Sequence, residues 1–167
     1  MNKQVCTFTV GDLLFGVDVL MIQEVLRPQV MTRVPLAPSV IRGLINLRGQ
    51  ILTAIDMRER MAFPPAPAEV SGMNIVVQLP DGAVSLLVDQ VGEVLDLDAS
   101  QHEPTPSVLQ GAVREITSGV YKLKDRLLLL LNVPAAATIA APLSTRKFTT
   151  TFDHTNQGTH EDDDVNP

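Results

Sequence analysis

The sequence predicts a mainly β chain built from two small, similar β units that pack together. Three observations lead to this prediction. Apolar and polar residues alternate as in half-buried strands, turn residues separate short apolar runs, and one sequence pattern occurs twice. Short strands at this spacing favour small barrels over one wide, open sheet. A chain of 167 residues with 45% hydrophobic residues is long enough for one ordinary domain or two very small ones.

The first half of the chain opens on a predicted hairpin. Residues 5–10 alternate with the period of a half-buried strand, Gly11-Asp12 forms a turn, and residues 13–17 form the second strand. Val19, Ile22, Gln23 and Leu26 predict a short helical turn after it. Prolines prevent a long helix before Ile41; they stand at Pro28, Pro35 and Pro38.

A second hairpin is predicted from residues 41–48 and 51–55, with Gly49-Gln50 as its turn. Pro-rich residues 63–68 then read as a linker or an edge loop. In the second half, the apolar runs at 74–79 and 83–88 flank Pro80-Asp81-Gly82, and Asp-Gly between such runs is a strong hairpin signal.

The last predicted strands are residues 119–123 and 126–131, around Lys124-Asp125. Pro104 and Pro106 mark a loop before them. Residues 132–141 predict a short helix that tolerates Pro134 in its first turn.

The two halves share one pattern. Residues 43–57 align without a gap on residues 119–133. Upstream, Val17-Asp18 matches Val88-Asp89, and Glu24-Val25-Leu26 matches Glu93-Val94-Leu95, in the same order. Each unit is too small to be very stable alone, so we expect the two to pack together.

We expect residues 1–142 to form a single domain. Within it, one subdomain covers about residues 11–65 and the other about residues 70–142, and an exchange of the N-terminal strand between them is left open. Residues 143–167 are rich in Ser, Thr, Asn and acidic residues and predict a disordered acidic tail whose role is left open.

Charge and cysteine content narrow the function. The net charge of −6 and the absence of Trp argue against a nucleic-acid partner. The single cysteine, Cys6, excludes an internal disulfide framework and reads as a buried small hydrophobe. The N-terminus lacks signal-peptide architecture, and the longest apolar run, residues 127–131, is far short of the ~20 residues that span a bilayer. We therefore expect a cytoplasmic protein without direct membrane insertion.

No residue pattern indicates catalysis, a metal site or a cofactor. His102 has no partner at zinc-site or nucleophile–base spacing. His154 and His160, with residues 162–164, could hold a divalent ion loosely, but a solvated tail is the favoured interpretation. Asp56 and Asp89 resemble a carboxylate pair, although both follow apolar strands, where capping a turn is the ordinary role.

A polar hairpin tip, residues 46–49, interrupts an apolar stretch. It is either a plain turn, in which Gly49 supplies a positive φ and Arg48 is solvated, or a site in which Arg48 pairs with a carboxylate and fixes a surface for a partner. Glu24 is the candidate carboxylate, because it ends the helix-like segment of the first half.

At these residues the sequence strongly resembles the CheW family of chemotaxis coupling proteins. The resemblance runs over about residues 5–140 and is strongest at 15–58. The Gly-x-x-Asn-Leu-Arg-Gly core at 43–49, with Gln23-Glu24-Val25 upstream, is specific in combination. Thr53 stands where the family often has proline, which should not harm a strand. The segments that carry the resemblance are residues 15–18, 22–25, 32–35, 41–49 and 55–58.

The resemblance implies two packed, five-stranded SH3-like barrels with short helical segments. It also implies an adaptor that links the cytoplasmic tips of chemoreceptors (methyl-accepting chemotaxis proteins) to a CheA-type histidine kinase, whose regulatory domain shares the fold. The chain lacks kinase modules, so a stand-alone adaptor fits, recruited from the cytoplasm to membrane-associated arrays. Association with other CheW-like domains in rings is left open.

The resemblance also implies the contact residues. The family positions tied to the receptor tip, a helical hairpin that docks in the groove between barrels, fall on Ile22, Glu24, Gly43 and Arg48. The weaker assignment of kinase contacts falls on Gly49, Val88 and Val91. Where the first unit has Arg48-Gly49, the second has Lys124-Asp125, so the first unit is expected to bear the receptor-facing site.

Two alternatives remain at this point. One is a coupling protein of a related chemosensory system that controls surface motility or another output. The other is a small-molecule-binding enzyme, which requires a convergent cluster of polar groups in the groove between the barrels.

Overall fold

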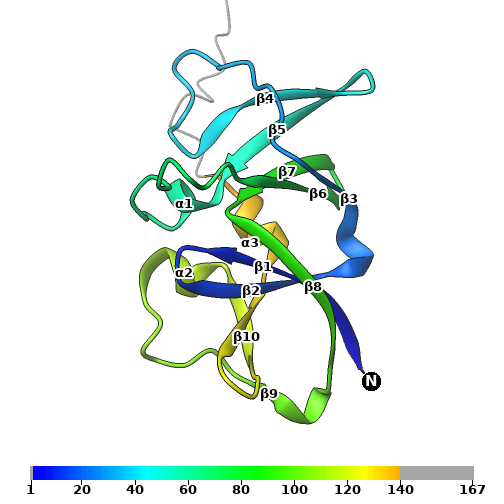
Figure 1. Cartoon of the computed structure of the whole chain (residues 1–167), viewed down its shortest axis with the longest axis vertical. Coiled ribbons are helices and arrows are strands. Elements are labelled where there is room, and N and C mark those ends of the chain that lie inside the picture. Colours follow the sequence, from blue (N-terminus) through cyan, green and yellow to red (C-terminus); the bar gives the residue numbers. More distant parts are fainter. Residues whose placement is uncertain (1, 140–167) are drawn as a thin grey trace, which may run out of the picture.

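The structure, a computed structural model, describes residues 2–139 and is mainly β, with two sheets and short helices (Figure 1). The predicted fold class, two packed SH3-like β units, is confirmed. None of the helices in residues 2–139 is long and apolar enough to cross a membrane. The strands are β1 (Lys3–Val10), β2 (Leu13–Asp18), β3 (Ile22–Leu26), β4 (Ile41–Leu47), β5 (Gln50–Asp56), β6 (Met73–Leu79), β7 (Gly82–Val88), β8 (Gln90–Leu97), β9 (His102–Glu103), β10 (Thr117–Lys122) and β11 (Leu127–Leu131). The helices are η1 (Val19–Met21), α1 (Met57–Arg60), η2 (Ala99–Gln101), α2 (Gly111–Glu115) and α3 (Val133–Ala137).

Each sheet contains strands from both halves of the chain. The six-stranded sheet has the order β8-β1-β2-β11-β10-β9, and the five-stranded sheet has the order β3-β6-β7-β5-β4. The β1–β2 hairpin pairs with β8 on one side, antiparallel through β1, and with β11 on the other side, parallel through β2. In the same way the β6–β7 hairpin pairs with β3, antiparallel through β6, and with β5, parallel through β7. Strands β10 and β4 extend the two sheets beyond β11 and β5. The two sheets do not divide at residues 65–70, where the boundary between the subdomains was predicted, because strands before and after these residues form one sheet. The limits of the subdomains stay a prediction.

The predicted helical turn is wrong beyond Met21. Residues 19–21 form η1, but residues 22–26 form the edge strand β3, which pairs with β6. Partly buried and exposed residues alternate along β3, which is the period of a strand. In a window of five residues, the apolar positions fit the period of a helix as well as that of a strand, and the pairing with β6 makes the segment a strand. Long-range pairing also produces β8, which pairs with β1 and which the sequence did not predict. Helices α1 and α2 were missed as well.

The sequence repeat has a structural counterpart. The register of the β4–β5 pair shifts between Ile41 and Gly43, and that of the β10–β11 pair shifts at the equivalent place, between Thr117 and Gly119. The helix after each hairpin is capped at the same position. Asp56 accepts hydrogen bonds from backbone amides of α1, and Asn132 accepts one from an amide of α3. The capping role predicted for Asp56 is confirmed, and so is a short helix with Pro134 in its first turn. That helix was predicted over residues 132–141 but ends at Ala137, and residues 138 and 139 are not helical.

The core is divided among three clusters. The largest lies between the sheets and includes Phe8 and Phe15, whose stacked rings are 5.4 Å apart between centroids. Smaller clusters belong to each sheet alone, for example around Leu128 in the six-stranded sheet and Leu52 in the five-stranded one. This division explains the unbroken apolar run of β11, because alternate leucines enter the inter-sheet cluster and the cluster of the six-stranded sheet.

A charged group ties the two sheets together at the crossover between β7 and β8. The Arg58 side chain, on α1, donates to both carboxylate oxygens of Asp89 at 2.8 and 2.6 Å. The Asp89 carboxylate also accepts the backbone N–H of Gly11, in the β1–β2 turn, at 2.8 Å. Burial alone would raise the pKa of Asp89, but the hydrogen bonds from Arg58 and Gly11 outweigh it and lower the pKa.

Replacing Asp89 with alanine should lower the free energy of unfolding by about 1–3 kcal/mol, because it leaves the mostly buried Arg58 without its partner. Since the folded-state pKa of Asp89 is lowered, its contribution is present above about pH 4 and is lost as the pH falls further. Urea unfolding at several pH values should therefore show the difference from the unmodified chain shrinking in acid. Asp96→Ala, on the exposed side of β8, is the control and should stay within about 0.5 kcal/mol. Equal effects of both substitutions would contradict the proposed tie.

Candidate functional site

A bidentate ion pair joins Arg48 to Glu24. The two guanidinium nitrogens Nη1 and Nη2 of Arg48 donate to Oε2 and Oε1 of Glu24, each at 2.8 Å. The parallel geometry matches the planar fork of arginine to the carboxylate. Of the two interpretations of the hairpin tip, the structure shows the one in which Arg48 pairs with Glu24.

The pair links opposite edges of the five-stranded sheet. Glu24 lies on β3, at one edge, and Arg48 lies in the turn between β5 and the other edge strand, β4. Such a contact requires the sheet to curl until its edges approach, as strands do in a small barrel. The ion pair therefore sits where the sheet closes on itself, next to the exposed side chains of an edge strand.

The turn that carries Arg48 is one residue earlier than predicted. Leu47 pairs with Gln50, so Arg48 and Gly49 are the two turn residues, with φ of 52° and 86°. Positive φ at both central residues suits the twist of a two-residue hairpin and explains the glycine. The Asn46 side chain accepts the backbone N–H of Gly49 at 3.0 Å and fixes the turn. The Asn-Leu-Arg-Gly sequence thus sets the position from which Arg48 reaches Glu24.

The ion pair also sets the charge state of both partners. Hydrogen bonds from Arg48 lower the pKa of Glu24, and the same bonds raise the pKa of Arg48. The Arg48 side chain is 73% exposed and that of Glu24 is 25% exposed. Because water and salt screen such a pair, its value lies in orienting the two side chains more than in global stability.

Gly43 is buried on β4 and makes room for another part of the same chain. A Cβ atom there would lie 2.7 Å from the carbonyl oxygen of Thr32. Thr32 and Leu44 exchange two backbone hydrogen bonds, of 2.9 and 2.8 Å, which hold the segment between β3 and β4 against the sheet. Gly43 thus permits a close backbone approach, and the approaching backbone is that of Thr32 rather than that of a partner.

The remaining predicted residues lie in different settings. Ile22 is partly buried on β3 and packs against the inter-sheet core, two positions before Glu24. Gly49 is open, because a Cβ atom there would have no described residue within 4 Å other than its own neighbours in the chain. Val88 is only 2% exposed, so it cannot touch a partner directly in this conformation. Val91 is partly buried on β8, opposite Phe8 of β1.

Sequence reasoning missed several residues around this site. Val25 follows Glu24 and is 38% exposed, and Ile51, in register with Asn46, is 59% exposed. They give the surface beside the ion pair an apolar character. The importance of Thr32 was also missed, because only the folded chain brings it to Gly43. The Arg58–Asp89 pair was missed although both residues lie in segments that carry the repeat or the family resemblance.

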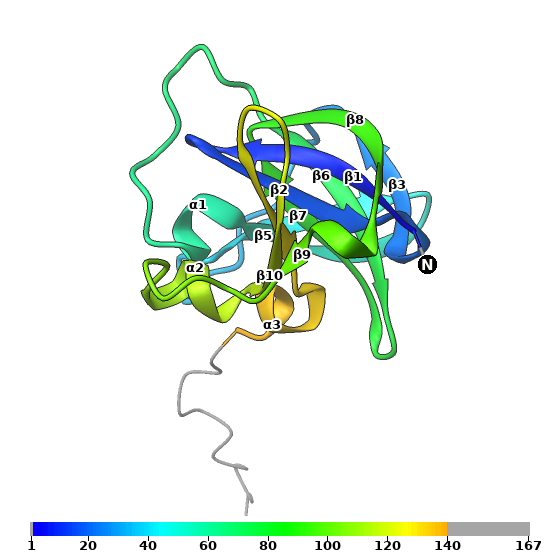
Figure 2. The ribbon, with the colours of Figure 1, turned by 90° about the horizontal axis from the view of Figure 1, so that it is seen from below.

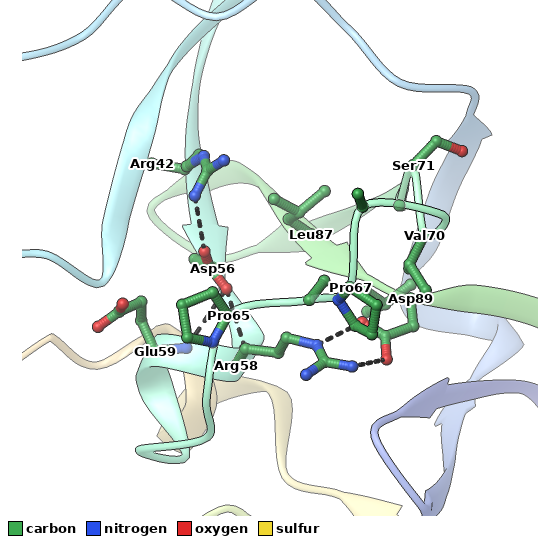
Figure 3. A pocket seen from close by; sticks show the side chains of 14 residues that line it. Arg42, Asp56, Arg58, Glu59, Pro65, Pro67, Val70, Ser71, Leu87 and Asp89 are labelled. Carbon is green, nitrogen blue, oxygen red and sulfur yellow. Dashed lines mark hydrogen bonds and ion pairs between the residues drawn. The ribbon is translucent and has the colours of Figure 1, made fainter.

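A polar hollow of about 270 Å³ lies between the end of β5, α1 and the loop of residues 65–72 (Figure 3). Four of its charged side chains form two pairs: Arg42 donates to Asp56 at 3.3 Å, and Arg58 donates to Asp89. Glu59 also lines the hollow and forms no ion pair with the residues from 2 to 139. Within residues 2–139, no group of three His, Cys, Asp or Glu side chains is placed to hold a metal ion. The loose metal site considered for His154 and His160 lies outside the described residues, as does the predicted disorder of residues 143–167.

Replacing Arg48 with alanine should raise the pKa of Glu24 toward the ordinary glutamate value of about 4.3, because the hydrogen bonds that lower it are lost. A ¹³C NMR titration of the Glu24 carboxyl carbon measures this directly. Arg27→Ala removes an exposed arginine from the same region and should leave the titration of Glu24 unchanged. An unchanged titration in the Arg48→Ala protein would show that the pair does not persist in solution.

Comparison with known proteins identifies the family to which this chain belongs. The family model of the CheW-like domain matches residues 4–140. A chemotaxis protein CheW from Klebsiella aerogenes is 31% identical over 133 residues, which cover 80% of each chain. One from Rhizobium meliloti is 30% identical over 132 residues, which cover 79% of this chain and 85% of the relative.

A solved structure shows the same architecture. The crystal structure of the scaffolding protein TtCheW from Thermoanaerobacter tengcongensis is similar to this chain with a TM-score of 0.72 and 29% sequence identity. The match covers 78% of this chain and 89% of that one. The family match over residues 4–140, the relatives and the shared fold agree with the resemblance seen in the sequence, and this chain belongs to the family of the CheW-like domain.

Proposed function

We propose that this chain is a non-catalytic adaptor that couples the cytoplasmic tips of chemoreceptors to a CheA-type histidine kinase. The observation that supports the proposal most is the Arg48–Glu24 ion pair, at positions that the family resemblance assigns to receptor contact. The relatives are named chemotaxis proteins, and the similar solved structure is named a scaffolding protein. The protein acts in the cytoplasm and is recruited to receptor arrays at the membrane.

The proposed receptor surface combines apolar contact with a fixed charge. Ile22 and Val25 supply apolar area on β3, next to Glu24, and Ile51 supplies more on the neighbouring hairpin. A helix of the receptor tip docks by burying apolar side chains, while a charged group at the rim fixes its register. Arg48 meets the second requirement, because its side chain is both exposed and held in one orientation by Glu24.

Gly43 has an indirect part in this proposal. Since Gly43 lies under Thr32, a larger residue there displaces the segment between β3 and β4. That displacement moves the two strands that carry or neighbour Glu24 and Arg48. Gly43 is therefore a positioning residue, and Ile22, Glu24 and Arg48 remain the proposed contacts.

The proposed kinase surface is narrower than the sequence indicated. Gly49, at the open hairpin tip, and Val91, on β8, are accessible enough to lie at an interface. Val88 belongs to the inter-sheet core and supports Val91 from within. Because Gly49 and Val91 belong to different sheets, the two surfaces can be tested separately with kinase fragments.

Replacing Arg48 with alanine should weaken binding of a receptor-tip fragment about tenfold or more, because the charged contact that fixes the register of the docked helix is lost. Isothermal titration calorimetry with a purified receptor-tip hairpin measures the affinity, and thermal unfolding checks that the variant stays folded. Arg27→Ala should bind as the unmodified chain does. An Arg48→Ala protein that binds with unchanged affinity would remove Arg48 from the receptor site.

A further inference from the structure

The arginines of this acidic chain are concentrated in one block. Between Glu24 and Asp56 the sequence contains Arg27, Arg33, Arg42 and Arg48 and no acidic residue, whereas the whole chain has a net charge of −6. Arg48 binds Glu24, and Arg42 binds Asp56. Arg27 and Arg33 form no ion pair with any residue from 2 to 139. The segment between β3 and β4 thus carries cations that the described structure does not neutralise.

The same segment exposes apolar side chains. Val30 is 94% exposed and Leu36 is fully exposed, so the segment presents apolar area to solvent beside its arginines. Leu36 also has a φ of 62°, in the left-handed region that costs about 1–2 kcal/mol for an L-residue. Arg33 and Val34 line a hollow of about 490 Å³, whose other lining residues include Glu59. We define Arg27, Val30, Arg33, Val34 and Leu36 as the loop surface.

The described chain ends beside this loop. Ile139 and Pro38 line one cavity of about 320 Å³, together with Arg60 of α1. The Arg60 side chain donates to the carbonyl oxygen of Ala135 at 3.1 Å and so anchors α3 to α1. Figure 2 shows α3 as the last helix before the described chain ends. Residues after Ile139 therefore start next to the end of the segment that bears the loop surface.

The sequence beyond that point has the complementary character. Residues 148–167 contain no Lys or Arg, and they combine two phenylalanines with a concentration of acidic residues at 161–164. We propose that this acidic C-terminal segment binds the loop surface of its own chain, with carboxylates of residues 161–164 at Arg27 and Arg33. Phe148 and Phe152 cover the exposed apolar side chains. This inference does not depend on the proposed receptor or kinase contacts.

Because the acidic segment and the loop surface belong to one chain, even weak contacts between them are sufficient for binding. Random-coil statistics give a chain of about 20 residues a root-mean-square reach of roughly 25 Å. The connection therefore holds the segment near the loop surface at an effective concentration in the millimolar range. Because the attraction is between solvent-exposed charges, it weakens when the Debye length falls to about 3 Å at 1 M salt. Binding of the acidic segment to the loop surface is therefore sensitive to salt.

A nitroxide label on the acidic segment tests the proposal in the full chain. Thr159→Cys introduces the label site without removing an acidic residue. The native Cys6 is 6% exposed, and burial raises the pKa of its thiol, so labelling favours the introduced cysteine. In low salt, the amide NMR signals of Val30, Arg33 and Leu36 should lose most of their intensity. The signals of Lys124 and Asp125, on the equally exposed β10–β11 turn, should keep theirs.

Charge variants separate specific binding from chance proximity. Arg27→Gln with Arg33→Gln should restore the signals of the loop surface, and so should 1 M NaCl. Lys124→Gln with Arg126→Gln removes the same charge from the β10–β11 turn and should leave the broadening in place.

Signals of the loop surface that keep their intensity in low salt, or broadening that both double variants leave unchanged, would overturn the proposal. In a second sample, ¹⁵N protein without the nitroxide is mixed with ¹⁴N protein that carries it. Broadening of the loop-surface signals in this mixture would show that the acidic segment of a second copy binds there, and would also overturn the proposal.

Discussion

Neither half of this chain completes a sheet on its own, and the rest of the structure depends on that constraint. The β1–β2 hairpin pairs with strands of the second half, and the β6–β7 hairpin completes the sheet of β3, β4 and β5. The largest apolar cluster therefore lies between the sheets, where both halves contribute to it. Asp89 stands at the crossover between the sheets and binds both α1 and the β1–β2 turn. The repeat is thus one interlocked unit, in which a small barrel gains stability from its neighbour.

The candidate site follows from this arrangement. Glu24 lies at one edge of the five-stranded sheet because β3 pairs only with β6, and Arg48 reaches it from the other edge because the sheet curls. The equivalent turn of the second half carries Lys124 and Asp125, which form no such ion pair among the described residues. The two halves share strands, register shifts and helix caps, but the first half alone has the arginine that closes its sheet. Duplication accounts for the fold, and this difference is the reason we propose the receptor-facing site in the first half.

The sequence was most informative where the structure is local. The β1–β2 and β6–β7 hairpins follow from alternation and turn residues within a few positions, and Asn46-Leu47-Arg48-Gly49 marked the site because polar residues interrupted an apolar stretch. The pairing of residues 22–26 with β6 could not be predicted, since a five-residue window fits both a helix and a strand. The approach of Thr32 to Gly43 and the burial of Val88 were equally out of reach, because both depend on packing between distant segments.

A double-mutant cycle tests most directly whether the Arg48–Glu24 pair positions the receptor surface. The affinity of a receptor-tip fragment is measured by calorimetry for Glu24→Gln, for Arg48→Gln and for the two together. If Glu24 acts by orienting Arg48, each single substitution lowers the affinity for the receptor-tip fragment. The affinity of the double variant is then no lower than that of Arg48→Gln alone, because the two partners act as one unit. Free-energy losses that add in the double variant, or an unchanged affinity in Glu24→Gln, would contradict the account.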